Sequence, residues 1–364
     1  MACRRARRGA RPETRGHALR IPVAGARHQD RVGTMTRSEG QGVAAGVDIG
    51  GTTIKLGLAA AGQVLARGRI PYAPLGSFDD VAERIVQGVR AMEAEAGRRA
   101  DALGIAAPGH ARPEDGLMVD GTANVPLLRS RSLAAELRTR TGLFTATVND
   151  GSAATLGELH FGAGRGVARF ALLTLGTGVG GGIVVGRRLV TGDDGVPPEL
   201  GAMVLDDGPA GHRTLEDFAS AGGFSAAYRR AGGDTALSPI DIFAQAAAGQ
   251  GVAIATIDAV ARRIAQALGT LVNALNLEAC LVGGGIAEAG EPLLQRIRAQ
   301  LPQFTWPFLL ARVRVARAET GQDAGMLGAA LTALRRHQAS GAAASGRPAA
   351  AGPPGNGPSG AGAH

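Results

Sequence analysis

The chain is poor in cysteine, lysine and aromatic residues. Its 364 residues include two cysteines, Cys3 and Cys280, a single lysine, Lys55, and only 3% aromatic residues. Two cysteines exclude a disulfide framework and fit a reducing cytoplasm. Cys280 stands in an apolar run, where it is expected to act as a small buried hydrophobe. The strong preference for arginine over lysine indicates a GC-rich genome rather than a function.

Long apolar runs are also missing. The longest uncharged segment, 170–186, contains six glycines. It therefore predicts two strands around a turn instead of a membrane-spanning helix. The first 34 residues contain no apolar stretch of signal-peptide length. The sequence predicts a cytoplasmic protein without a membrane partner.

Positive charge is concentrated at one end. Residues 1–34 hold nine arginines against Glu13 and Asp30, so they carry +7 of the formal net charge of +8. The remainder is almost neutral, and no nucleic-acid partner is expected. Residues 1–41 are predicted to be a disordered basic arm, or the product of a mis-assigned start codon if translation begins at Met35.

The most informative motif is Asp-Ile-Gly-Gly-Thr-Thr-Ile-Lys at Asp48–Lys55. Apolar runs at 43–47 and 54–60 flank it, which indicates strand, tight glycine turn, strand. The glycines let the backbone approach an anion and present N–H donors to it. Asp48, at the exit of the first strand, is placed to hold Mg²⁺ through water. The motif predicts a phosphate-binding hairpin, and an ordinary Gly-Gly hairpin is the alternative.

Strands and helices alternate after this hairpin, which predicts an α/β fold with mostly parallel pairing. The apolar patterns predict helices at 79–97, 133–141, 153–159, 252–275 and 287–301, and strands at 102–107, 145–148, 170–175, 183–185 and 279–282. Ligands of such sheets bind at the carboxyl ends of strands. Asp48, Pro108-Gly109 and Asn149-Asp150 all stand at such ends.

A second glycine hairpin occurs in the other half of the chain. Gly176-Thr-Gly-Val-Gly-Gly-Gly182 follows one strand and precedes another, as the motif at Asp48 does. Gly283-Gly-Gly285 follows a later strand and is a candidate seat for a nucleotide base or ribose. Two phosphate-binding hairpins, one in each half, predict two lobes that close on a nucleoside triphosphate.

The motifs together resemble the ROK family, which comprises repressors, open reading frames and sugar kinases. They stand in this order: Asp48-Ile-Gly-Gly-Thr-x-x-Lys55, Pro108-Gly109, Asn124, Asn149-Asp150, Gly157-Glu158, Gly176-Thr-Gly-Val-Gly-Gly-Gly182, Glu199-Leu-Gly, Leu215-Glu216 and Gly283-Gly-Gly285. The resemblance implies a two-lobed actin-like ATPase (ribonuclease H-like) fold, each lobe a mixed sheet flanked by helices. It implies an N-terminal lobe at 42–150, a C-terminal lobe at 151–320 and a helix at 321–336 that returns to the N-terminal lobe. Residues 337–364, mainly Ala, Gly and Pro, are predicted to be a disordered tail.

The resemblance also assigns roles to residues of this chain. Asp150 matches the catalytic base of the family, and Asp48 the carboxylate on the metal side. The sugar-holding positions match Asn124, Asn149, Asp150, Glu199 and Glu216. The ATP and phosphate positions match Asp48, Gly50, Gly51, Thr52, Thr53, Lys55, Gly176, Thr177, Gly178, Gly180, Gly283, Gly284 and Gly285. Without the family, Asn124 would be interpreted as a turn residue, and Glu199 and Glu216 as solvated carboxylates.

One departure from the family pattern concerns zinc. Many members place a His after Glu-x-Gly and a cysteine cluster before Leu-Glu, and these bind a structural Zn²⁺. Here Ala202 follows Gly201, and the stretch 206–214 contains no cysteine. Without thiolates a tetrahedral zinc site has no ligands, so the expected cofactors are ATP and Mg²⁺, with no zinc. The same His contacts the sugar in the family, so Ala202 leaves the sugar specificity open.

The sequence therefore predicts a glucokinase-like sugar kinase of carbohydrate metabolism that makes glucose 6-phosphate. An N-acetylated amino sugar, fructose or a cyclitol are alternative acceptors, and polyphosphate is an alternative donor. A non-catalytic sugar-sensing regulator is the competing class. Only about 47 residues precede Asp48, and they lack the helical periodicity of the winged helix-turn-helix that family repressors carry. The resemblance implies a homodimer or homotetramer.

Overall fold

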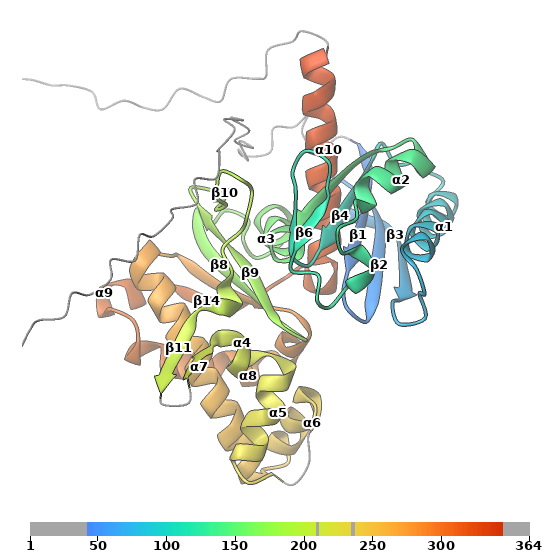
Figure 1. Ribbon diagram of the computed structural model, residues 1–364. Helices are drawn as coiled ribbons and strands as arrows, with labels where there is room; N and C mark the ends of the chain where they lie inside the picture. Colours follow the sequence, from blue (N-terminus) through green and yellow to red (C-terminus); the bar gives the residue numbers. More distant parts are fainter. Residues whose placement is uncertain (1–41, 209–210, 234–236, 345–364) are drawn as a thin grey trace, which may run out of the picture. The chain divides into compact units, whose positions relative to one another are not determined.

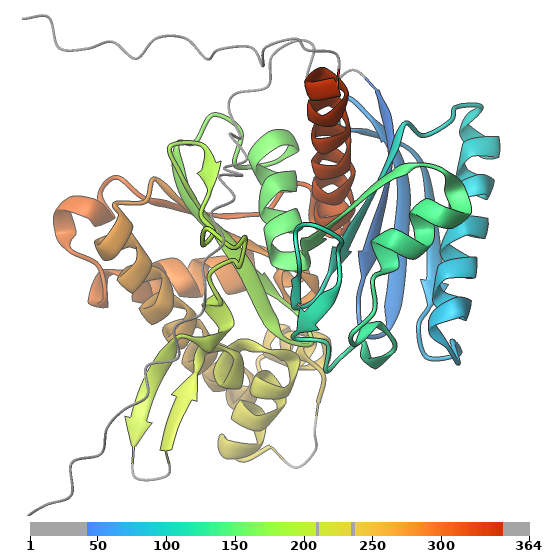
Figure 2. The same ribbon diagram turned by 45° about the horizontal axis from the view of Figure 1, so that its top comes forward.

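The computed structural model describes residues 42–344 except 209–210 and 234–236. These residues form two five-stranded sheets with helices packed on them (Figures 1 and 2). Each sheet combines antiparallel and parallel pairings, which confirms the predicted fold of two lobes built on mixed sheets. The predicted disordered arm at 1–41 lies outside the described residues, as does the tail from 345 onward.

The N-terminal sheet has the strand order β3-β2-β1-β4-β7. Its strands are β1 (Val43–Ile49), β2 (Thr53–Ala60), β3 (Gln63–Pro71), β4 (Ala102–Ala107) and β7 (Phe144–Asn149). The hairpin strands β1, β2 and β3 pair antiparallel, whereas β4 and β7 continue the sheet in parallel. Val43, Ala45 and Val47 pack in one core with α1 (Phe78–Ala96), while Ala44 packs against α10 (Ala324–Ala344). Alternate residues of a strand face opposite sides, so the two helices cover opposite faces.

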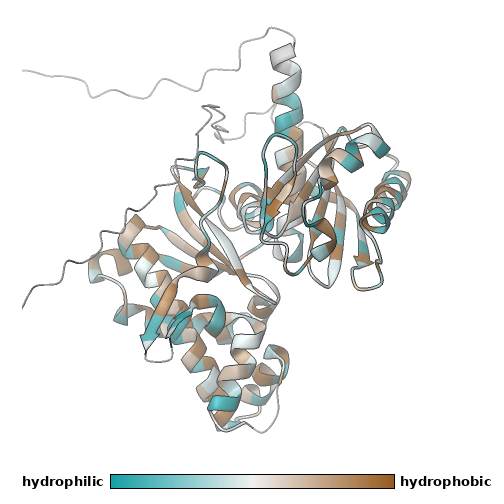
Figure 3. Ribbon diagram, in the orientation of Figure 1, coloured by the Kyte–Doolittle hydropathy of each residue, from teal (hydrophilic) through white to brown (hydrophobic). Residues whose placement is uncertain are grey.

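The C-terminal sheet repeats this topology in the order β10-β9-β8-β13-β14. Its strands are β8 (Arg169–Leu175), β9 (Val179–Val185), β10 (Arg188–Leu189), β13 (Ala279–Gly283) and β14 (Arg314–Arg317). The core on one face includes α7 (Gly251–Leu275), and the core on the other includes α3 (Asp150–Phe161). Apolar residues run along the strands of both sheets (Figure 3). The two hairpins at Asp48 and Gly176 therefore occupy equivalent places in equivalent sheets.

Shorter elements complete the fold. They are β5 (His110–Ala111), β6 (Met118–Asp120), α2 (Leu133–Thr141), β11 (Val204–Gly208), β12 (Gly211–Thr214), α4 (Leu215–Ala219), α5 (Ala221–Arg230), α6 (Pro239–Ala247), α8 (Glu291–Gln300) and α9 (Pro307–Leu310). The chain after Gly284 first forms a 3-10 helix, Gly285–Ala289, before α8 begins. Of the described helices, none is long and apolar enough to cross a membrane.

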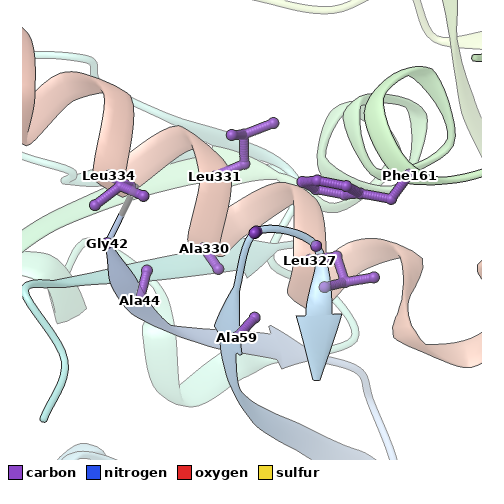
Figure 4. Close-up of a pocket in the computed structure, with 10 residues that line it drawn as sticks. Gly42, Ala44, Ala59, Phe161, Leu327, Ala330, Leu331 and Leu334 are labelled. Carbon is purple, nitrogen blue, oxygen red and sulfur yellow. The ribbon is translucent and has the colours of Figure 1, made fainter. Parts of the chain in front are cut away.

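Helix α10 packs so closely on the N-terminal sheet that backbone atoms of the helix contact backbone atoms of the strands. A Cβ atom at Gly46 would lie 2.1 Å from the carbonyl oxygen of Met326, and one at Gly104 would lie 1.9 Å from that of Ala329. Only glycine permits this approach. The helix continues to Ala344, eight residues past the predicted end at 336. A small apolar hollow of about 20 Å³ lies beside α10, β1, β2 and Phe161 (Figure 4), which is enough for little more than one water molecule.

Glu158 fixes α3 to the segment that enters α10. Its side chain is fully buried. It accepts hydrogen bonds from the backbone N–H groups of Ala163 (2.8 Å), Glu319 (3.1 Å) and Thr320 (2.7 Å), and from the Thr320 hydroxyl. A buried carboxylate is tolerated only when its oxygen atoms are satisfied in this way. Glu158 is thus a structural residue that connects two distant parts of the sequence.

We expect Glu158→Gln to lower the free energy of unfolding by about 3–5 kcal/mol, because its amide NH₂ would face N–H donors in the interior. Urea denaturation followed by circular dichroism measures this loss. Glu319→Gln is the matched control, because the Glu319 side chain is exposed and forms only a long ion pair with Arg165, at 3.8 Å. It should change the free energy of unfolding by less than about 0.5 kcal/mol. Equal losses in the two variants would contradict this role for Glu158.

Candidate active site

Asp48 occupies the end of β1 next to the first glycine turn. It pairs directly across the hairpin with Lys55, whose Nζ atom lies 3.5 Å from the Asp48 Oδ2 atom. Burial raises the pKa of Asp48, and the Lys55 ammonium opposes that shift. Lys55, predicted as a phosphate contact, therefore also holds the Asp48 carboxylate in place.

The first turn of α10 lies against the same carboxylate. A Cβ atom at Gly325 would lie 2.9 Å from the Asp48 Cγ atom and 3.0 Å from its Oδ2 atom. Only glycine leaves room for the carboxylate in its observed position. Gly325 stands in an Ala/Gly-rich stretch far from Asp48 in the sequence, and no motif there predicts this contact.

Asn149 and Asp150 join β7 to α3. The Asn149 side chain caps the helix, since its Oδ1 atom accepts from the Ser152 N–H at 3.0 Å and its Nδ2 atom donates to the Gly109 carbonyl at 3.1 Å. The amide thus has a local structural task in addition to any ligand contact. The cap also extends α3 to Asp150, three residues before the predicted start at 153.

Asp150 is the first residue of α3 and is half-buried. Its Oδ1 atom accepts from the Gly151 N–H at 2.8 Å. Burial raises the pKa of Asp150 to about 6, and the negative charges of Asp48 and Glu199 add to that shift. The structure therefore brings three predicted carboxylates into electrostatic contact. A carboxyl group with a pKa near neutrality can exchange a proton at physiological pH.

A close backbone contact sets the position of Asp150. A Cβ atom at Gly151 would lie 2.5 Å from the Gly181 carbonyl oxygen of β9. Gly181 itself has a φ of 147° and lies close to the Leu172 carbonyl. The glycines at 180–182 thus lie within β9, which begins at Val179 rather than at the predicted residue 183. The turn proper is only Gly176-Thr177-Gly178, and Gly180 pairs with Thr174 in the sheet.

The second hairpin is tied to Glu216. The N–H of Gly176 donates to the Gly178 carbonyl at 3.0 Å, which closes the turn. The Glu216 Oε2 atom, in the first turn of α4, accepts from the Val179 N–H at 2.8 Å. One oxygen of Glu216 is thus engaged by the hairpin, and the exposed side chain keeps acceptor capacity for a ligand.

Three further predicted positions lie at turns beside these elements. Asn124 is exposed, and its backbone carbonyl would lie 3.1 Å from a Cβ atom at Gly51, so it borders the first hairpin. Glu199 is exposed and precedes a 3-10 helix, Leu200–Ala202. Gly284 has a φ of 83°, and a Cβ atom there would lie 2.4 Å from the Leu175 carbonyl. The triple-glycine turn therefore lies against the end of β8, which leads into the second hairpin.

The side chains at this site fit a single Mg²⁺ ion whose ligands are mostly water and substrate phosphates rather than protein groups. Among the described residues, no group of three His, Cys, Asp or Glu side chains could hold a metal ion. Mg²⁺ in phosphotransfer sites typically uses one or two carboxylates together with water and substrate phosphates. Asp48, half-buried beside the first hairpin, is the carboxylate that would serve in this way.

Comparison with known proteins agrees with this geometry. The ROK family model matches residues 44–336. The glucokinase of Thermotoga maritima is 34% identical over 304 residues, which are 78% of this chain and 95% of that protein. A ROK family glucokinase from Streptomyces griseus, solved in complex with glucose and AMPPNP, is 29% identical with a TM-score of 0.70, and the match covers 80% of this chain and 99% of that one. The ROK hexokinase of Thermus thermophilus is 29% identical with a TM-score of 0.68, covering 82% and 99%.

The chain therefore belongs to the ROK family and has its two-lobed actin-like fold. Within the family it is a sugar kinase of the glucokinase-like group. The motif order that indicated this family is confirmed, whereas the roles of individual site residues are still predictions.

The raised pKa of Asp150 predicts a stability effect. Because burial disfavours the ionised form, ionised Asp150 destabilises the fold above pH 6, and this cost disappears as the pH falls toward its ordinary pKa of 3.8. Asp150→Asn should therefore raise the unfolding free energy by about 1–3 kcal/mol at pH 8 and leave it unchanged near pH 4. Thermal melts of both proteins across this range test the effect. A gain that is independent of pH would show that charge is not its cause.

Proposed function

We propose that this chain transfers the γ-phosphoryl group of ATP to a hydroxyl of glucose, forming glucose 6-phosphate in the cytoplasm. The observation that carries the proposal is Asp150, a half-buried carboxyl with a pKa of about 6 at the start of α3, in electrostatic contact with Asp48 and Glu199. The 34% identity to a glucokinase over 78% of the chain supports glucose as the acceptor.

Asp150 acts as the base. Phosphoryl transfer needs the acceptor hydroxyl oriented and its proton removed as the new O–P bond forms. A carboxylate with a raised pKa is a better proton acceptor than an ordinary one, and it is still ionised at neutral pH. The short bond between its Oδ1 atom and the Gly151 N–H fixes one oxygen and leaves the other for the sugar.

Planar polar side chains hold the sugar. Asn124, Glu199 and Glu216 are exposed at the edges of the hairpins, and their oxygen and nitrogen atoms suit vicinal hydroxyl groups. Asn149 contributes with the donor and acceptor capacity that its cap leaves free. Ala202, also exposed, offers a methyl group where a His is common in the family, so this chain holds the sugar with one polar contact fewer.

The phosphate side is formed by the two hairpins. Backbone N–H groups and threonine hydroxyls at Gly50–Thr53 and Gly176–Gly178 would bind the phosphates, and Lys55 would add a positive charge. The turn at Gly283–Gly285 would receive the rest of the nucleotide. Mg²⁺, held by Asp48 through water, would neutralise the phosphate oxygens. No zinc is required.

A second acceptor class is favoured by one observation. Ala202 is small and exposed, which leaves space beside the sugar for a substituent. N-acetyl-D-glucosamine kinases are also among the relatives, at 28% identity over 79% of the chain for the Pectobacterium atrosepticum enzyme. An N-acetylated amino sugar is therefore the alternative acceptor.

We further propose a homodimer or homotetramer, because Trp306 and Phe308 are 61% and 57% exposed and form an apolar pair on the surface.

A coupled assay of ADP release tests the proposal with Mg-ATP and glucose, N-acetylglucosamine, N-acetylmannosamine, fructose, mannose and a cyclitol. We expect glucose-dependent turnover that falls by about 10²–10⁴-fold in Asp150→Asn, because the base is lost. Glu95→Gln, an exposed change on α1, is the matched control and should leave turnover intact. Turnover only with an N-acetylated sugar would favour the alternative acceptor. Sugar binding without turnover would instead indicate a sensor. Formation of glucose 6-phosphate with polyphosphate but not with ATP, measured directly as sugar phosphate, would refute ATP as the donor.

A further inference from the structure

A second cavity lies within the C-terminal lobe, outside the proposed active site. Its volume is about 310 Å³, it is open to solvent on one side, and it is bordered by β12, α4, α5 and α7. The lining residues are Arg213, Phe218, Ala227, Arg230, Ala231, Ala259, Val260 and Arg263. This volume is at the lower end of the range of small-molecule sites. None of the residues assigned to sugar or nucleotide lines it.

Three arginines from three different elements meet at this cavity. Arg213 comes from β12, Arg230 from α5 and Arg263 from α7. The guanidinium carbons of Arg213 and Arg263 lie 3.9 Å and 4.5 Å from the centre of the Phe218 ring. Stacking on an aromatic ring orients a guanidinium, and the N–H groups in its plane that do not donate to the protein remain available for a ligand. Phe218 therefore pre-organises two of the three cations.

The positive charge at the cavity is only partly compensated. Arg263 donates to the Asp206 Oδ2 atom at 3.4 Å, to the Leu205 carbonyl at 3.2 Å and to the Gln266 Oε1 atom at 3.1 Å. Arg213 donates to the Asp217 backbone carbonyl at 3.4 Å. The Asp217 carboxylate is engaged by the N–H and hydroxyl of Thr214. No carboxylate of the described residues forms an ion pair with Arg230. Burial, followed by the charges of Arg213 and Arg229, lowers the pKa of Arg230. A bound anion would relieve this repulsion.

We propose that this cavity is a binding site for a small phosphate monoester. Guanidinium groups match the geometry of a phosphate and form strong charge-assisted hydrogen bonds with it. Phe218, Ala231 and Val260 give an apolar wall for a compact carbon skeleton. The volume suits a sugar phosphate and is small for a nucleoside triphosphate. Free inorganic phosphate shares the same recognition chemistry and is the second source of the ligand.

The site is connected to the sugar site through α4. Phe218 and Glu216 are two residues apart on this five-residue helix, and Arg213 precedes its cap, Thr214. Glu216 in turn accepts from the Val179 N–H of the second hairpin. A ligand that binds Arg213 and Arg263 while they stack on Phe218 therefore bears on the packing of α4 and, with it, on the position of Glu216. This step rests on the proposed role of Glu216, and it predicts that the ligand and the sugar change each other's affinity.

Titration calorimetry with glucose 6-phosphate and, separately, inorganic phosphate tests the site. Saturating glucose and AMPPNP are included to occupy the active site. We expect one additional site per chain, weakened about 10-fold or more in Arg230→Ala and Arg213→Ala, since each loses a charge-assisted hydrogen bond. Arg90→Ala, an exposed charge change on α1 in the N-terminal lobe, should bind as the wild type does. Tighter binding of glucose 6-phosphate would identify the ester as the ligand, and equal binding would identify phosphate alone.

Absence of the additional site, or equal binding by all three arginine variants with unchanged melting temperatures, would overturn the proposal. The comparison of variants measures binding and requires no turnover. It therefore tests the anion site even if the chain does not phosphorylate glucose. The coupling has its own readout in the KM for glucose. It should shift with added ligand in the wild type and in Arg90→Ala, and not in Arg230→Ala, whose KM without ligand should be unchanged. A shift of equal size in Arg230→Ala would show that the ligand acts at the active site.

Discussion

The proposed site depends most on the hydrogen bonds between the buried Glu158 carboxylate and backbone N–H groups. It lies near the end of α3, whose first residue is Asp150, and it binds the backbone at Glu319 and Thr320, which leads into α10. The first turn of α10 contains Gly325, which lies against Asp48. One buried group thus sets the relation between the helix that carries the proposed base and the helix that borders the proposed metal-side carboxylate. Its satisfied hydrogen bonds explain why a charge is tolerated there.

Close backbone packing is the second constraint. Gly46 and Gly104 admit α10 to the N-terminal sheet, and Gly151 lets the start of α3 approach the Gly181 carbonyl of the C-terminal sheet. The two sheets have the same strand order, so each presents a glycine hairpin at an equivalent place. The proposed chemistry follows from this arrangement. Glycine-rich turns supply N–H donors for phosphates, while desolvation near the strand ends raises the pKa of Asp150 toward the range useful for proton transfer.

The sequence predicted the elements with a strong local signal. The hairpin at Asp48, the helix at 252–275 and the strand at 102–107 have clear apolar periodicity, and the ordered motifs identified the family. The β11–β12 hairpin was missed, because β11 is short and largely exposed and so lacks an alternating apolar pattern. Helices α4 to α6, which have 5, 10 and 9 residues, were missed as well. Gly325 was missed because its role arises from a contact with a residue 277 positions away. The exposed side chains of Glu199 and Glu216 could be assigned to the site only through the family resemblance.

The pH dependence of kcat/KM for glucose tests the central claim, that Asp150 is the base, most directly. The proposal predicts a loss of activity on the acid side with a midpoint near pH 6, because a protonated Asp150 cannot accept the hydroxyl proton. This acid limb should be absent from the residual activity of Asp150→Asn. Activity that stays constant from pH 8 down to pH 4.5, with the fold intact, or an acid limb that persists in Asp150→Asn, would contradict the assignment.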